Sequence, residues 1–162
     1  MLLSPQEEQS RELFAYAGLV LYWAQCFEMS LEIFLLIHTR LANKSISLSE
    51  LESYESDIQR KTLGGLLRDV RQRVAFDSSA EIAIGDALEK RNLLVHRFFK
   101  ERGIEALSLA GRAEMIERLQ DFEQSFRVAD RVAWSIVEAA RKVLGIPDEI
   151  IQQELKRLAE IS

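Results

Sequence analysis

Apolar residues recur at alternating spacings of three and four residues through the first quarter of the chain. The repeating positions are Leu13, Ala17, Val20, Ala24, Phe27, Leu31, Phe34, His38 and Leu41, with one histidine among them. This spacing is typical of one face of an α-helix. The sequence Ser-Pro-Gln-Glu at residues 4–7 has the pattern of a capping box with proline at the first helical position. Together they predict a long helix over about residues 5–43.

A second stripe of the same period runs through the last third of the chain. Its members are Met115, Leu119, Phe122, Phe126, Ala129, Val132 and Ile136. They predict another long helix over about residues 110–144, which Gly145 is suited to terminate. Pro147 follows, so we expect one further short helix from there to about Ala159.

Shorter helices are predicted between the two long ones. A polar segment over residues 44–59 contains a short helical stretch, and a second helix covers about residues 62–73. A third begins at Asp77-Ser78-Ser79, where Ser78 and Glu81 have capping-box spacing, and reaches about Phe99. No strand-like alternation interrupts this pattern. The predicted fold is an all-α helical bundle forming a single domain over residues 1–162.

The first predicted helix is apolar enough to raise the question of a membrane span. Gln25, Glu28 and Glu32 interrupt its most apolar stretch, and a charge at mid-membrane costs about 2.5–3.5 kcal/mol. We therefore expect a core helix and no membrane. A single cysteine, Cys26, lies among apolar neighbours, and the first residues lack the pattern of a secretory signal. Both features favour a cytoplasmic protein.

The formal net charge of −5 hides an uneven distribution. Residues 1–59 carry a net charge of −6, residues 60–102 carry +4, and residues 103–162 carry −3. A positive segment on an acidic protein can still bind a polyanion locally. Chance clustering on a solvated face explains the charge pattern equally well.

The basic segment contains the group of residues with the most suggestive chemistry, Arg91 to His96. Arg91 falls within the apolar stripe of the third short helix, where an arginine is costly without a partner. Asn92 and His96 are four residues apart and so share the adjoining face, one helical turn from each other. The surrounding basic residues are Lys90, Arg97, Lys100 and Arg102.

These residue types suit chemistry at an RNA phosphodiester. A histidine titrates near neutrality and can act as general base or acid at a ribose hydroxyl. An arginine can hold the phosphate and offset the charge that develops in the transition state. Asn92 can orient either group, and Lys90, Arg97 and Lys100 are candidates for substrate binding. None of these roles requires a metal or another cofactor.

At these positions the sequence resembles the HEPN superfamily, whose signature is an arginine, four to six residues, and then a histidine. Arg91, Asn92 and His96 supply the arginine, the polar residue favoured after it, and the histidine. The resemblance implies an α-helical bundle that acts as a homodimeric, metal-independent endoribonuclease by 2′-hydroxyl attack. Such a protein is often the toxin of a toxin–antitoxin pair, with a protein antitoxin as a partner. Other members of the family have lost catalysis and serve as interaction or regulatory modules.

A purely structural interpretation of the same residues is also open. Arg91 could pair with Glu28 or Glu32, which form a polar row with Gln25 on an otherwise apolar helix and need partners. His96 could simply cap the end of its helix. A carboxylate that fixes Arg91 is also compatible with function, because it would preorganise a site.

Other classes of site have less support. A di-metal helical bundle requires glutamate three residues before histidine, whereas Leu35 precedes His38 and Leu93 precedes His96 at that spacing. One cysteine and two histidines also make a zinc site unfavourable. A DNA-binding repressor is the weaker alternative, since no compact helix-turn-helix with a basic recognition helix is evident.

Overall fold

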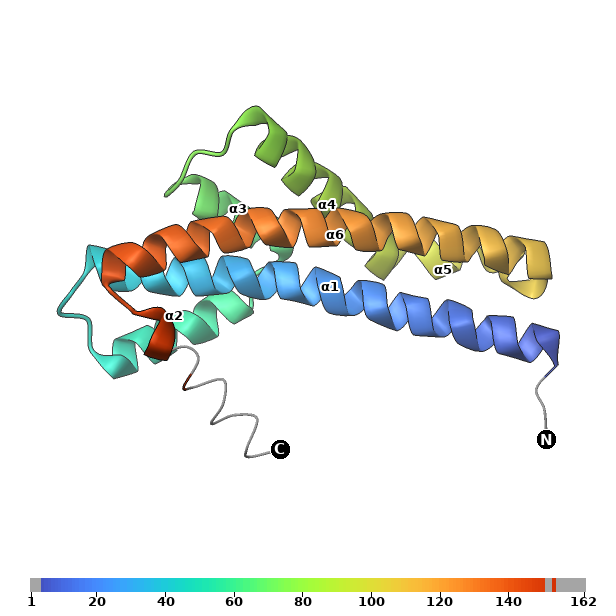
Figure 1. Cartoon of the computed structure of the whole chain (residues 1–162), viewed down its shortest axis with the longest axis horizontal. Coiled ribbons are helices and arrows are strands. Elements are labelled where there is room, and N and C mark those ends of the chain that lie inside the picture. Colours follow the sequence, from blue (N-terminus) through green and yellow to red (C-terminus); the bar gives the residue numbers. More distant parts are fainter. Residues whose placement is uncertain (1–3, 151–152, 154–162) are drawn as a thin grey trace.

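Two long helices form the axis of the protein (Figure 1). The computed structural model describes residues 4–150 and residue 153. Helix α1 covers Pro5–Ala42 and helix α6 covers Leu109–Leu144, close to the predicted limits. The side chain of Gln9 donates to the carbonyl oxygen of Leu109, and Ser30 donates to Asp130. Both contacts join residues 100 apart in sequence, so α1 and α6 run parallel.

The apolar stripes predicted for the two long helices face each other. The buried residues of α1 include Leu13, Val20, Ala24, Phe27, Leu31 and Phe34. Those of α6 include Met115, Leu119, Phe122, Phe126, Ala129 and Ala133. Burying two helical stripes against each other over about ten turns supplies most of the core, at about 25 cal/mol for each Å² removed from water.

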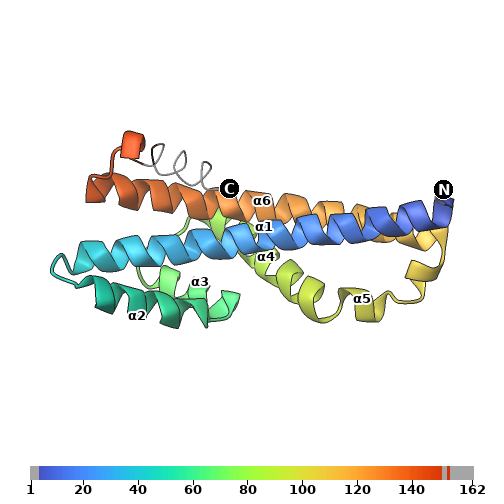
Figure 2. The same cartoon turned by 90° about the horizontal axis from the view of Figure 1, so that it is seen from below.

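Because the two long helices are parallel, the chain between them must return along the bundle. It does so through short helices on one side of the α1–α6 pair (Figure 2). They are α2 (Leu48–Gln59), α3 (Leu63–Arg71), α4 (Ser78–His96), α5 (Phe98–Glu101) and the 3₁₀ turn η1 (Glu105–Leu107). No strand occurs among the described residues, so the prediction of an all-α helical bundle is confirmed.

Capping side chains fix where the helices begin. The predicted capping box of Ser4 and Glu7 is present, and Ser47 forms a second, unpredicted capping box with Glu50. The box predicted for Ser78 and Glu81 is wrong. Asp77 is the N-cap of α4 and accepts from the backbone N–H of Ala80. The carboxylate of Asp77, one residue before Ser78, satisfies the free N–H groups of the first helical turn. Glu81 instead forms an ion pair with Arg71 at 2.6 Å.

The predicted end of the third short helix at Phe99 is also wrong. Helix α4 ends at His96, and Arg97 has φ −133° and ψ −28° before α5 begins. This break lets two consecutive aromatic rings contact different long helices. Phe98 is buried against Phe122 of α6, whereas Phe99 stacks on Phe14 of α1 at 5.9 Å between ring centroids.

The start of α6 packs unusually closely on the turn before it. A Cβ atom built on Gly111 would lie 2.1 Å from the backbone oxygen of Glu105 in η1. Only a glycine permits that approach. Arg112, 5% exposed, donates from Nη1 to the carbonyl oxygen of Ala106 at 2.7 Å and from Nε to Gln9 at 3.1 Å. Gly111 and Arg112 therefore tie η1 and α1 to the beginning of α6.

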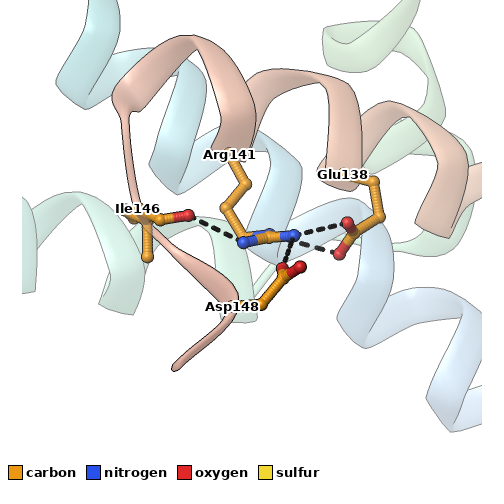
Figure 3. Close-up of polar contacts among 4 residues, drawn as sticks. All are labelled: Glu138, Arg141, Ile146 and Asp148. Carbon is orange, nitrogen blue, oxygen red and sulfur yellow. Dashed lines mark hydrogen bonds and ion pairs between the residues drawn. The ribbon is translucent and has the colours of Figure 1, made fainter. Parts of the chain in front are cut away.

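A buried arginine closes the other end of α6 (Figure 3). Arg141 donates to Glu138 at 2.7 Å, to the carbonyl oxygen of Ile146 at 2.7 Å, and to Asp148. Gly145 has φ +75° and terminates the helix as predicted. The short helix predicted from Pro147 to Ala159 falls largely outside the described residues.

Within the described part of the chain, α1 is long and apolar enough to cross a membrane by length and composition alone. The core helix of a bundle has the same properties. In its most apolar window 39% of the residues are buried, so α1 also presents apolar side chains on the outside of the bundle.

Candidate functional site

Arg91 lies on the side of α4 that faces α1. Its Nε donates to Oε1 of Glu28 at 2.8 Å, which is one of the two contacts predicted for it from the sequence. The two side chains are 22% and 24% exposed, so the pair lies at the rim of the bundle and not deep in its core. An arginine that was expected to be costly on an apolar stripe is thus satisfied by a carboxylate from the neighbouring helix.

The contact with Glu28 leaves most donors of the guanidinium unused. It involves Nε alone, and no other described residue accepts a hydrogen bond from the terminal Nη groups of Arg91. Because the guanidinium is planar and rigid, a hydrogen bond that fixes its Nε also fixes the direction of its remaining N–H groups. This arrangement suits the binding of an anion at the rim of the bundle.

Asn92 and His96 are both exposed. His96 is the last residue of α4, and Asn92 precedes it by one turn. Neither side chain has a hydrogen-bond partner among the described residues, and the backbone N–H of Arg97 makes the closing bond of the helix to Leu93. The side chain of His96 therefore does not cap the helix within the described part of the chain. It is open to solvent and to a ligand.

Lys90, predicted to bind substrate, points toward α6 and is already engaged. Its Nζ lies 3.0 Å from Asp86, 2.8 Å from Asp121 and 2.7 Å from the hydroxyl of Ser125. Burial lowers the pKa of Lys90, but the hydrogen bonds to Asp121 and Asp86 outweigh burial and raise it overall. The ammonium is thus kept charged and held against α6.

Arg97 and Lys100, also predicted to bind substrate, lie just beyond His96. Both are exposed, and the only carboxylate near Arg97 is Glu101, 3.6 Å from its Nε in the described structure. The Arg97 side chain is 62% exposed, so this pair is well solvated and contributes little to holding the arginine in place. The two cations beside His96 are therefore available to a polyanion.

Glu32, expected to support Arg91, makes no ion pair with it. Partial burial raises the pKa of Glu32, and the nearby carboxylates of Glu28 and Glu55 raise it further. Glu28 and Glu32 of the polar row on α1 therefore differ in their roles. Glu28 holds Arg91, whereas Glu32 is a carboxyl whose neutral form the surroundings favour.

An apolar hollow lies between α1 and the end of α4, one helical turn beyond Arg91. Its volume is about 370 Å³, and it is lined by Ala17, Gly18, Leu21, Leu94, Val95 and Phe99. Val95 directly precedes His96 in sequence. The stacked rings of Phe14 and Phe99 lie at the same side of the bundle, where α5 meets α1.

The hollow was not predicted from the sequence. A second three–four stripe on the first helix indicated it, consisting of Arg11, Phe14, Gly18, Leu21, Gln25 and Glu28. This stripe faces α4 and α5, as the contacts of Phe14 with Phe99 and of Glu28 with Arg91 show. This second stripe is hard to recognise because it mixes glycine, aromatic and polar residues, whereas the core stripe is regularly apolar.

Within the described part of the chain, no three His, Cys, Asp or Glu side chains are grouped in a way that could hold a metal ion. The available chemistry is that of the exposed imidazole and amide of His96 and Asn92 on one edge of α4, with the partly exposed guanidinium of Arg91 on the adjoining side that faces α1. These groups can move a proton, orient an oxygen and bind an oxyanion.

Models of known protein families, curated protein sequences and solved structures all give no match to this chain.

Proposed function

We propose that this protein is a metal-independent endoribonuclease with Arg91, Asn92 and His96 as its active site. The observation that carries the proposal is that one of these three side chains is held by a neighbouring helix, whereas the other two are exposed. Glu28 holds Arg91 at 2.8 Å, whereas Asn92 and His96 lie exposed on the same edge without partners in the described structure. A bundle that used this segment only for packing has no need of an exposed histidine and asparagine beside a positioned arginine.

In the proposed reaction, His96 accepts the proton of a ribose 2′-hydroxyl. The oxygen of that hydroxyl attacks the adjacent phosphorus, and the bond from phosphorus to the 5′-oxygen breaks. The leaving oxygen takes up a proton from solvent, which leaves a 2′,3′-cyclic phosphate and a 5′-hydroxyl. The Nη groups of Arg91 stabilise the negative charge that develops on the phosphoryl oxygens, and Asn92 orients the attacking ribose.

Basic residues next to this edge support an anionic substrate. Arg97 and Lys100 are exposed and lie within five residues of His96, so they can contact the phosphates that flank the scissile one. Lys90 has a different part in the proposal, because Asp86 and Asp121 already bind its ammonium. It steadies α4 against α6.

We also propose that the protein acts as a homodimer. The outer surface of α1 exposes Leu19, Tyr22 and Met29, and Trp134 of α6 is 44% exposed. Soluble monomers rarely expose many large apolar side chains together, so this surface is suited to a second copy of the chain. If the ribonuclease is a toxin, a protein antitoxin is a further candidate partner.

Cleavage of single-stranded RNA by the purified protein in excess EDTA tests the proposed activity. We expect the wild type to cleave, and His96→Ala to lose at least 100-fold in rate, as is typical for removal of a general base. His38→Gln is the matched control, since it replaces the other histidine of the chain, on α1. Equal rates for the wild type and His96→Ala, or no cleavage of any RNA, would contradict the proposal.

A non-catalytic interaction module is the second candidate function, and the apolar outer surface of α1 favours it. In that case expression of the protein has effects that His96→Ala leaves unchanged. Substitution of Tyr22, which is 56% exposed on that surface, abolishes them instead. Comparing the growth of cells that express either variant separates the two functions.

A further inference from the structure

The apolar hollow between α1 and the end of α4 has no role in the chemistry described above. We propose that it is a base-binding subsite of the ribonuclease, which holds a nucleobase next to the scissile phosphate by stacking and apolar contact. This inference rests on the proposed function, and it specifies how a single-stranded substrate is held.

The position of the hollow is the first argument. Leu94 and Val95, which line it, follow Arg91 by three and four residues and so lie on the same side of α4, and Phe99 lines the hollow from the next short helix. A nucleotide whose phosphate is bound by the Nη groups of Arg91 can therefore place its base in this hollow, one helical turn away. Gly18 provides the opposite wall, and a Cβ atom there would meet nothing within 4 Å. The hollow is thus open where a base can enter.

The lining of the hollow is the second argument. Five of its six lining side chains are aliphatic or absent, and the sixth is the ring of Phe99, which stacks on Phe14 and is still 38% exposed. A volume of about 370 Å³ accommodates a planar purine ring. Proteins that bind single strands without sequence preference use aromatic faces in this way, at about 1–3 kcal/mol for each stacked base.

The surrounding charges favour a nucleic acid over an apolar partner. Arg97 and Lys100 are exposed and lie within two residues of Phe99 in sequence, and Arg11 lies one turn before Phe14, whose ring stacks on Phe99. At the other end of the same face of α1, Glu28 binds Arg91 of α4. Residues 11 and 28 of one helix are about 25 Å apart, so the basic groups bracket the apolar hollow over the length of a few nucleotides.

The lining predicts how cleavage depends on sequence. No polar side chain lines the hollow, so nothing there can read the hydrogen-bonding edge of a base. We expect a preference for purines over pyrimidines at one position beside the cleaved bond, because purines stack over a larger area. Adenine and guanine are expected to serve almost equally.

Filling the hollow tests the inference directly. Gly18→Leu adds a side chain at an open helical position, so the fold is expected to be retained or stabilised. Gly85→Leu is the matched control, since Gly85 is also helical and exposed, has open space around it, and does not line the hollow. The ligand is a five-nucleotide 2′-O-methyl RNA with 2-aminopurine at its centre, which cannot undergo attack by a 2′-hydroxyl.

We expect the wild type and Gly85→Leu to quench the 2-aminopurine fluorescence and to bind the strand equally. Gly18→Leu is expected to bind at least tenfold more weakly and to lose the quenching. Phe99→Leu should also lose most of the quenching, because it keeps the bulk but removes the stacking face. Equal binding and quenching by Gly18→Leu and wild type would overturn the inference.

The failure of this inference is distinguishable from failure of the proposed function. If the wild type cleaves RNA and Gly18→Leu cleaves it equally, with the same preference among bases, the activity stands and the subsite does not. If Gly18→Leu instead converts a dimer to a monomer in sedimentation and the strand does not compete, a second copy occupies the hollow and the inference is overturned. Because the ligand cannot be cleaved, its binding remains informative even if the wild type has no activity.

Discussion

At the scale of single residues, the contact between Arg91 and Glu28 determines how the candidate site is held. The pair is partly exposed, so most of the stabilisation from its charges is screened by water. Its larger consequence is orientation, because Glu28 binds Nε and leaves the Nη groups free for a phosphate.

A double-mutant cycle measures this contact. We expect a coupling free energy of about 1 kcal/mol between Arg91→Ala and Glu28→Ala in urea unfolding, since the pair has good geometry but is not fully desolvated. The Arg97–Glu101 pair, at 3.6 Å and with side chains more than half exposed, serves as the control and should give a value near zero. Equal coupling in the two cycles would show that Glu28 does not hold Arg91 in solution.

Ionised Glu32 destabilises the folded protein at neutral pH, in contrast to the Arg91–Glu28 pair, which stabilises it. Its pKa is raised in the folded state by burial first and by Glu28 and Glu55 next. The stability that protonated Glu32 provides is present below the pKa of the unfolded chain and is lost as pH rises through the raised folded pKa. Glu32→Gln, which imitates the protonated form, should therefore increase the free energy of unfolding at pH 7.

The gain should be less than about 1 kcal/mol, because Glu32 is only partly buried, and it should vanish near pH 3.5. Glu89→Gln provides the control, since it removes the same charge from an exposed position of α4. Chemical unfolding at the two pH values gives the comparison. A gain for Glu32→Gln that persists unchanged at low pH would rule out the titration of Glu32 as its cause.

At the scale of elements, the contact between η1 and the beginning of α6 depends on one glycine. Gly111→Ala places a Cβ atom 2.1 Å from the backbone oxygen of Glu105, and backbone atoms cannot move aside as a flexible side chain can. We expect the free energy of unfolding to fall by about 1–3 kcal/mol. Gly85→Ala, where the added Cβ meets nothing, should instead stabilise by about 0.5–1 kcal/mol, and thermal unfolding of both variants measures the difference.

The sequence was sufficient to predict the helices that have a periodic apolar face and a clear cap. Both long helices follow from such stripes, and their observed limits, Pro5–Ala42 and Leu109–Leu144, lie within a residue of those predicted. The end of α4 at His96 could not be predicted in this way. Phe98 continues the apolar stripe of that helix, and only contacts with α1 and α6 require the break at Arg97.

The candidate site was predictable to a similar extent. Arg91 and Glu28 could be paired from the sequence because each was a charged residue on an apolar face and needed a partner. The engagement of Lys90 by Asp121 was not predictable, because it depends on the crossing of α4 over α6. The hollow also required the structure, since residues from α1, α4 and α5 meet to line it.

At the scale of the whole molecule, the parallel arrangement of α1 and α6 leaves the outer side of α1 uncovered over much of its length (Figure 2). We expect the wild type to sediment at about twice its chain mass of 18.6 kDa if this surface binds a second copy. Tyr22→Arg should shift it to the monomer, because a charge is costly in an apolar interface. Ile82→Arg, at a still more exposed apolar residue of α4, is the control and should leave the mass unchanged.

The chemical ends of the cleavage products test the proposed 2′-hydroxyl mechanism most directly. A short RNA should be cut in EDTA to give a 2′,3′-cyclic phosphate on one fragment and a 5′-hydroxyl on the other. A single 2′-deoxy substitution at the cleaved position should abolish cutting there, because His96 then has no hydroxyl to deprotonate. Cleavage of the 2′-deoxy strand, products with a 5′-phosphate, or a requirement for added metal would contradict the assignment of Arg91, Asn92 and His96.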